Sequence, residues 1–319
     1  MRQGLGVGSL LIVLVFAPAR REEAQTNGAA DQSAAPYRLS VSVDEVILTF
    51  HAADARGLPV NDLKLDELTL LDNGKPPGKI LDFQLQRDFP IRAGIIVDTS
   101  DSMRESLPRD RAIAIEYAQR MLRQQTDQAF VTEFGRVAKP LQIWTSDPAA
   151  VVAGVRGVSV GGAGPAGGTA IFDTLLRACL NEFGRIDHNT SGNFILLFSD
   201  GEENASYASL KDAVDMCQRS NTAIYAFRAG SKESFGSTGP ATLAELAAKT
   251  GGRVFLEAES DANIYDDLRF IEANLRNQYR IVFRPAELKH DGEFHAIALE
   301  TPDRVASTTI RSGYYAPKH

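Results

Sequence analysis

The sequence predicts an α/β fold in which a doubly wound, mostly parallel sheet is inserted into a β-sandwich formed by the N- and C-terminal flanks. Residues 90–277 alternate strand-like apolar runs with helix-like segments, as in a parallel sheet with helices on both faces. Residues 37–89 and 278–319 contain only strand-like segments, and neither flank is large enough to bury both faces of a sheet. We therefore expect the flanks to pack together. Two separate β appendages are the alternative.

The first flank begins with period-two alternation at 39–43 and an apolar run at 46–50, both typical of strands. Asn73-Gly74 marks a turn, and residues 80–85 alternate again. The second flank is expected to form strands at 279–284, 294–299 and 308–310. Asp291-Gly292, between the first two of these, is a hairpin signal.

The middle region is expected to form strands at 91–97, 129–134, 141–144, 194–198, 223–227 and 253–256. A first helix follows Asp98, with apolar positions at Ile113, Tyr117, Met121 and Leu122. Further helices are expected at 149–155, 169–183, 210–219, 243–249 and 264–276. In such a fold the loops at the carboxyl ends of the strands gather at one edge, where functional residues are expected.

The N-terminus has the pattern of a signal peptide over residues 1–19. Arg2 precedes a short apolar stretch, and Ala17-Pro18-Ala19 resembles a small-residue cleavage site. The stretch is shorter than the roughly 20 residues that cross a bilayer, so we expect no membrane span in the mature chain. Residues 20–36 are polar and alanine-rich, and we expect a disordered leader. The prediction is a secreted protein, periplasmic or extracellular, with an uncleaved anchor or a disordered start as the alternatives.

The 319-residue chain has a net charge of −7 and no basic cluster, so a nucleic-acid partner is not expected. Its two cysteines, Cys179 and Cys217, fall on expected helices that flank one strand. Export permits a disulfide between them. Two buried thiols explain the sequence equally well.

Three loops carry the candidate site. Asp98-Thr99-Ser100-Asp101-Ser102 and Ser199-Asp200-Gly201 each follow a buried strand, and Gly168-Thr169-Ala170 opens a helix. Because these loops should leave the same edge of the sheet, we expect their oxygen atoms to converge. The candidate metal ligands are Asp98, Ser100, Ser102, Thr169 and Asp200. The acidic pair Glu202-Glu203 that follows is expected to be a solvated surface, with a role at the rim of the site as the alternative.

Hydroxyl and carboxylate oxygens suit Mg²⁺ rather than Zn²⁺, with Mn²⁺ and Ca²⁺ as alternatives. Mg²⁺ prefers octahedral oxygen coordination and keeps several waters. Three neutral hydroxyls, with two carboxylates acting through water, would leave the ion electron-poor. An electron-poor ion with an open position binds an external carboxylate strongly. The alternative is a metal-free scaffold in which Asp98 and Asp200 cap helices.

The D-x-S-x-S sequence at 98–102, followed by Thr169 and Asp200 in separate loops, resembles the metal ion-dependent adhesion site (MIDAS) of von Willebrand factor type A (VWA) domains. The resemblance covers roughly residues 91–277. It implies that Ser100, Ser102 and Thr169 coordinate the ion directly and that Asp98 and Asp200 act mostly through water. Segments 70–76 and 313–317 are similar to the flanks of bacterial secreted proteins related to this family.

The resulting prediction is a non-enzymatic, adhesive protein-binding module whose cation captures an Asp or Glu side chain of a partner protein. One alternative is a structural or scaffolding secreted protein whose ion only stabilises the site. Another is a Mg²⁺-dependent, phosphatase-like enzyme with Asp98 as nucleophile. That pattern needs a second aspartate two residues later, where Ser100 stands.

Two further motifs are weaker. Residues 157–161 match the G-x-S-x-G elbow of serine hydrolases, but a helix is expected before Ser159 where the elbow needs a strand. Residues 162–167 match G-x-G-x-x-G, yet only three strand-like residues precede them. We interpret this glycine-rich segment as a pliable loop that lets Thr169 approach the ion.

Overall fold

The computed structural model describes residues 45–87, 90–161, 167–184, 192–228, 237–256, 261–287 and 289–317. The predicted signal peptide (1–19), leader (20–36) and strand at 39–43 lie outside the described residues, as do residues 162–166 of the glycine-rich loop. No helix of the described ranges is long and apolar enough to cross a membrane.

The middle region folds around a six-stranded sheet with the strand order β6-β5-β4-β7-β8-β9. The strands are β4 (Ile91–Asp98), β5 (Gln128–Phe134), β6 (Ala138–Thr145), β7 (Gly192–Ser199), β8 (Thr222–Arg228) and β9 (Val254–Leu256). Neighbours pair in parallel except β5 and β6, which are antiparallel. The central strands β4 and β7 are buried on both faces, which explains their nearly continuous apolar sequences.

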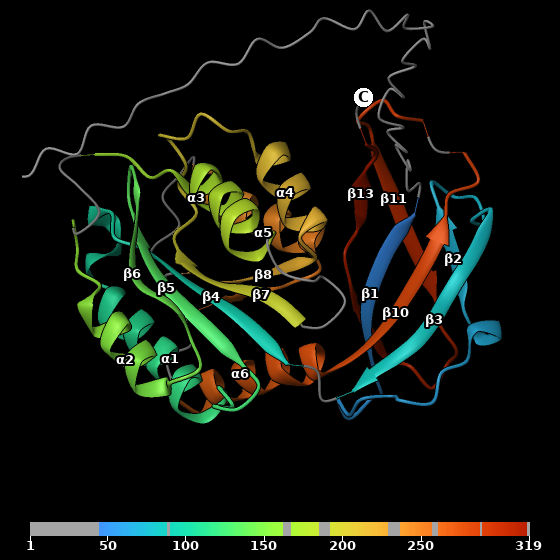
Figure 1. Ribbon diagram of the computed structural model, residues 1–319, viewed down its shortest axis with the longest axis horizontal. Helices are drawn as coiled ribbons and strands as arrows, with labels where there is room; N and C mark the ends of the chain where they lie inside the picture. The colour runs from blue at the N-terminus through green and yellow to red at the C-terminus, as the bar shows by residue number, and fades with distance from the viewer. Residues whose placement is uncertain are drawn as a thin grey trace, which may run out of the picture. The chain divides into compact units, whose positions relative to one another are not determined.

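Helices cover both faces of this sheet (Figure 1), as the doubly wound prediction requires. One apolar core includes residues of α1 (Leu107–Arg120), α2 (Pro148–Gly157) and α6 (Asp261–Arg276). The core on the other face includes residues of α3 (Ile171–Arg177), α4 (Leu210–Arg219) and α5 (Gly239–Thr250). Helix α3 continues as a π-helical segment, η3 (Ala178–Phe183).

Helix α4 begins with a capping box. The Ser209 hydroxyl accepts a hydrogen bond from the Asp212 amide at 3.2 Å, and the Asp212 carboxylate accepts one from the Ser209 amide at 2.9 Å. Two amide donors at the start of the helix are thereby satisfied. We expect Ser209→Ala to lower the free energy of unfolding by about 1 kcal/mol, because the Asp212 amide loses its acceptor. Denaturant unfolding would measure this, and an unchanged midpoint would contradict it.

Cys179 and Cys217 form a disulfide between η3 and α4, with their Cα atoms 5.0 Å apart. Both residues are fully buried in the core beneath α3, α4 and α5. The structure thus selects the disulfide over two buried thiols.

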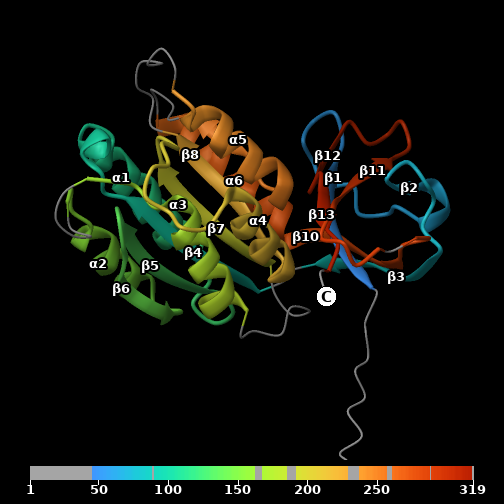
Figure 2. The same cartoon turned by 90° about the horizontal axis from the view of Figure 1, so that it is seen from above.

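The two flanks form a sandwich of two antiparallel sheets, with strand orders β12-β1-β10-β3 and β13-β11-β2 (Figure 2). The strands are β1 (Val46–Ala53), β2 (Thr69–Asp72), β3 (Lys79–Arg87), β10 (Asn277–Arg284), β11 (Phe294–Glu300), β12 (Ser307–Ile310) and β13 (Gly313–Tyr315). Strand β10 lies between β1 and β3, and β11 pairs with β2. Each sheet therefore joins both flanks around one core, with the α/β region inserted between them as predicted.

The hairpin predicted at Asp291-Gly292 is wrong. Gly292 has the positive φ of a turn, 75°, but β10 and β11 belong to different sheets. Each of these strands pairs with strands of the N-terminal flank, which buries its apolar side chains in the shared core. Long-range pairing therefore overrides the local turn signal.

A buried polar network joins the two flanks within the sandwich. Asp72 Oδ1 lies 2.8 Å from His295 Nδ1, and Asp72 Oδ2 accepts a hydrogen bond from the Tyr314 hydroxyl at 2.8 Å. These residues lie on β2, β11 and β13, so the network ties together the three strands of the second sheet. Segments 70–76 and 313–317 thus meet in space although they are far apart in sequence.

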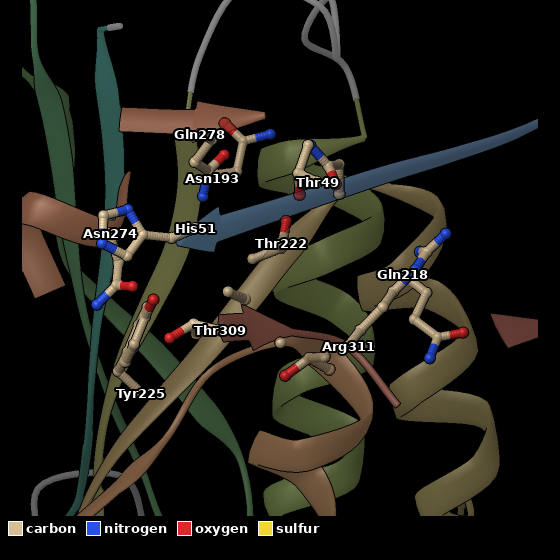
Figure 3. A pocket seen from close by; sticks show the side chains of 14 residues that line it. Thr49, His51, Asn193, Gln218, Thr222, Tyr225, Asn274, Gln278, Thr309 and Arg311 are labelled. Atoms are coloured by element: carbon tan, nitrogen blue, oxygen red, sulfur yellow. The ribbon is translucent and has the colours of Figure 1, made fainter. Parts of the chain in front are cut away.

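A polar cavity lies where the sandwich meets the amino-terminal ends of β7 and β8 (Figure 3). Its lining includes Thr49, His51, Asn193, Gln218, Thr222, Asn274, Gln278, Thr309 and Arg311. Gln218 Nε2 bridges the two parts by donating to the carbonyls of Lys249 at 2.6 Å and Gly313 at 2.9 Å. The sandwich therefore contacts the α/β region at the edge of the six-stranded sheet that lies opposite the carboxyl ends of β7 and β8.

A buried ion pair fixes the end of α6 at the same edge. Arg276 Nη2 donates to Asp127 Oδ2 at 2.7 Å, and Asp127 Oδ1 accepts from the Ile91 amide at 2.9 Å. Both charged side chains are buried. The pair links the start of β4 to the point where the chain passes from α6 into β10.

Candidate metal centre

The candidate loops leave the same edge of the sheet, as predicted. Strand β4 ends at Asp98, and its parallel neighbour β7 ends at Ser199, one residue before Asp200. The third loop is tied to the end of β5, because the Ala170 amide donates to the carbonyl of Gly135 at 2.8 Å. Parallel pairing of β4 with both β5 and β7 thus brings the three loops together.

Asp98 is fully buried at the end of β4. Its Oδ1 accepts a hydrogen bond from the Ser100 amide at 2.9 Å, and its Oδ2 accepts one from the Ser199 hydroxyl at 2.8 Å. The pKa of Asp98 is raised to about 6, chiefly by burial and also by the nearby charge of Asp200, against the effect of these hydrogen bonds. The buried carboxylate would therefore gain from a cation.

The spacing of the first loop has a simple physical basis. The Ser100 and Ser102 hydroxyl oxygens lie 3.1 Å apart, so alternate residues face one spot. Thr99 points elsewhere, and its amide and hydroxyl both donate to the carbonyl of Phe134. Met103 is fully buried and anchors the short 3-10 turn η2 (Asp101–Arg104), which fixes the two serines.

Thr169 lies two residues before α3 and not at its first turn, so the helix predicted at 169–183 starts too early. Its amide donates to Asn204 Oδ1 at 2.9 Å, and its carbonyl accepts from the Asn204 amide at 3.1 Å. Gly168 has a φ of 119°, and a Cβ there would lie 2.9 Å from the Ala205 side chain. The glycine before Thr169 is therefore required by conformation and by space.

Asp200 is half-buried, and its Oδ1 accepts a hydrogen bond from the Glu202 amide at 3.0 Å. The preceding residue, Ser199, is fully buried and donates its hydroxyl to Asp98. Ser199 also accepts from the Gly201 amide at 3.0 Å, so it links the first and third loops. In the sequence Ser199 stands out only as part of the Ser199-Asp200-Gly201 motif, and this linking role becomes visible only in the folded chain.

The interpretation of Glu202 and Glu203 as a solvated surface is wrong. Glu203 accepts hydrogen bonds from the amides of Ala205 and Ser206 at 2.9 and 2.8 Å, and from the Phe172 amide at 3.1 Å. Glu202 accepts hydrogen bonds from the Ser237 hydroxyl and the Gly239 amide. Both side chains are half-buried and hold neighbouring loops in place. No spacing rule predicts these contacts, since most of the partners lie in other segments.

The donor set fits a hard cation. Two adjoining hydroxyls, a buried carboxylate and a half-buried carboxylate supply oxygen only, the donor type that Mg²⁺, Mn²⁺ and Ca²⁺ prefer. Within the described ranges, no group of three or more His, Cys, Asp or Glu side chains could hold a metal. The hydroxyls of Ser100 and Ser102 are donors that the structure places side by side at this edge.

The competing elbow motif lacks its structural context. Helix α2 ends at Gly157, and the Ser159 amide donates to the buried carboxylate of Glu133 at 3.1 Å. A nucleophile elbow needs a strand before the serine and a helix after it. The segment 157–161 has neither in the required order.

Comparison with solved structures found weakly similar chains. The conserved hypothetical protein BatB from Bacteroides thetaiotaomicron is 14% identical with a TM-score of 0.46, over 57% of this chain and 97% of that one. Proximal thread matrix protein 1 from the mussel byssus, solved with a zinc-occupied MIDAS motif, is 16% identical with a TM-score of 0.47, over 64% of this chain and 50% of that one.

No curated protein sequence matches the chain. Residues 94–203 match the family described as von Willebrand factor type A domain. The matched segment runs from within β4 to just beyond Asp200, so it contains all five candidate ligands. Over this segment the chain therefore resembles a von Willebrand factor type A domain.

Proposed function

We propose that the chain binds one divalent cation, Mg²⁺, through Ser100, Ser102 and Thr169, and that Asp98 and Asp200 contribute through water. The observation that carries the proposal is the fully buried Asp98 carboxylate beside two serine hydroxyls 3.1 Å apart. A buried carboxylate without a cation is costly, since burial disfavours its charged form. An ion at this position would relieve that cost.

We further propose that the ion binds an Asp or Glu side chain of a partner protein. The three proposed direct ligands are neutral hydroxyls, so the bound cation would keep most of its charge and supply an attraction for an external carboxylate. Ser102 belongs to an exposed turn, so a partner can reach this side of the site. This arrangement favours adhesion over a role in which the ion only stabilises the loops.

The geometry favours binding over catalysis. Both oxygens of Asp98 accept hydrogen bonds, from Ser199 and from the Ser100 amide, and the carboxylate is fully buried. A nucleophilic aspartate must reach its substrate. Ser100 also stands where the phosphatase-like pattern needs a second aspartate. We therefore propose a non-enzymatic module.

Secretion is part of the proposal. The N-terminal segment has the apolar stretch and small residues of a signal peptide. The Cys179–Cys217 disulfide is consistent with an oxidising compartment, since disulfides are rare in the cytosol of most organisms. Detection of the chain in the exported fraction, with its N-terminus determined by sequencing, tests this part.

Calorimetric titration with Mg²⁺ tests the metal site. We expect Thr169→Ala to weaken Mg²⁺ binding at least about tenfold, because one of three neutral ligands is lost. The matched control is Thr301→Ala, in the sandwich after β11 and outside the candidate site. Equal affinity of the wild type and Thr169→Ala would refute the assignment.

Retention of exported proteins on the immobilised chain separates adhesion from scaffolding. Adhesion through the ion requires that retained proteins be released by a chelator and that Thr169→Ala fail to retain them. Retention that is indifferent to both changes would support the scaffolding alternative, in which partners bind elsewhere.

A further inference from the structure

A groove of about 230 Å³ lies beside the candidate metal centre, on the side of α3. Its lining includes Arg136 and Val137 from the loop between β5 and β6, Arg177 from α3, and Tyr207 from the loop that follows Asp200. None of these residues is a proposed ligand of the ion.

The groove and the metal centre share a wall. Ala170 and Ala205 line the groove. Ala170 directly follows Thr169, and the Ala205 amide donates to the Thr169 carbonyl at 3.2 Å. Because neighbouring Cα atoms are about 3.8 Å apart, an extended segment of a few residues can reach from the ion into the groove.

Two exposed apolar side chains give the groove a surface for packing. Tyr207 is 95% exposed and Val137 is 52% exposed. The backbone under Tyr207 is held, because Asp173 Oδ1 accepts hydrogen bonds from the amides of Tyr207 at 3.2 Å and Ala208 at 2.8 Å. A fixed loop that presents an exposed aromatic ring is typical of a binding surface.

The charge of the groove is positive in a chain whose net charge is −7. Arg136 and Arg177 are exposed, and neither has an ion-pair partner among the residues that the structure describes. Asp173, which also lines the groove, already accepts two backbone hydrogen bonds. The groove therefore complements a negatively charged side chain.

We infer that the groove binds a second acidic residue of the same partner segment whose first Asp or Glu binds the ion, with an apolar residue of that segment packed on Tyr207 and Val137. The inference rests on the proposed function, since it places the first acid at the ion. It names the partner as an extended acidic segment with two carboxylates and an apolar side chain. Arg136 and Arg177 would then set specificity without touching the metal.

A displayed library of random peptides, each about twelve residues long and so roughly 40 Å when extended, tests this inference. The library is selected on the wild-type chain in Mg²⁺ and eluted with a chelator, and the eluted sequences are read. The same selection is run on Arg136→Gln/Arg177→Gln. Its matched control is Arg156→Gln, an exposed arginine on α2 that is not part of the groove.

We expect wild type and Arg156→Gln to enrich peptides with two acidic residues at a constant spacing, and the double variant to enrich peptides with one. Tyr207→Ser should relax the apolar preference alone. Enrichment of peptides with one acidic residue by the wild type, or of peptides with two by the double variant, would refute binding of a second acid in the groove. Either result would leave the proposed metal site unaffected. A selection that yields no chelator-eluted peptide would count against both.

Discussion

The metal-free protein is expected to lose up to about 3 kcal/mol of stability as the pH rises from about 4 to 7, and Asp98→Asn is expected to remove most of that loss. The cause is the burial of Asp98, which raises its pKa from 3.8 to about 6 in the folded chain. The folded state therefore holds a proton that the unfolded state has already released.

The direction follows from proton linkage. Between pH 3.8 and about 6 the folded chain binds more protons at Asp98 than the unfolded chain, so stability falls as the pH rises. Below this window Asp98 is protonated in both states and its ionisation costs nothing. Above it the full cost is present. An asparagine side chain cannot ionise, so the Asp98→Asn variant loses this part of the pH dependence.

Denaturant unfolding in chelator at several pH values across this range measures the effect. The readout is the slope of the free energy of unfolding against pH, compared between the wild type and Asp98→Asn. Ionisable groups other than Asp98 contribute equally to the two slopes. Asp101→Asn is the matched control, because Asp101 is exposed and paired with Arg104 on the surface. Parallel profiles for the wild type and Asp98→Asn would rule the explanation out.

Added Mg²⁺ should reverse the loss in the wild type alone. A ligand at about 100 times its dissociation constant stabilises the folded state by about 2.7 kcal/mol. Asp98→Asn, which lacks the carboxylate that attracts the cation, should gain much less. In the absence of metal, Asp98→Asn would then be more stable than the wild type. In the presence of metal, it would gain less stability than the wild type. A variant whose fold is simply damaged does not show this pair of changes.

Much of the fold can be predicted from the sequence because its signals are local. Strands β4 and β7 are buried on both faces, so their apolar sequences are unambiguous, and the predicted helix at 210–219 has the bounds of α4. Strand β13 escapes prediction because its three residues, Gly313–Tyr315, carry no periodicity. It forms by pairing with β11, which the sequence around it does not reveal.

The candidate site, like the fold, can be predicted only in part from the sequence. The five proposed ligands stand out because they lie at or shortly after the end of a strand, or after a glycine-rich loop, and topology gathers such positions. The residues that orient them escape prediction. Asn204 holds Thr169 through its side chain, and Ser199 holds Asp98, but serine and asparagine in loops are too common to signal a role. Only the folded chain identifies their partners.

Loss of the Cys179–Cys217 disulfide is expected to lower the free energy of unfolding by about 4 kcal/mol. The bond closes a loop with a sequence separation of 38, and the entropy of closing such a loop in the unfolded chain gives this magnitude. Denaturant unfolding of Cys179→Ala/Cys217→Ala in chelator measures it. Thiol titration of the unfolded wild type without reductant provides the check, because two free thiols per chain would show that the bond is absent.

The same variant separates stability from metal binding. The disulfide fixes the far end of the helix that begins two residues after Thr169, whereas Thr169 itself is held by Asn204 and by the amide of Ala205. We expect these bonds to survive the loss of the disulfide, since neither of them involves a cysteine. We therefore expect the Mg²⁺ affinity of the folded double variant to stay within about twofold of the wild type, a change below roughly 0.4 kcal/mol. A tenfold loss would show that the site depends on the position of α3 and not on its own loop contacts.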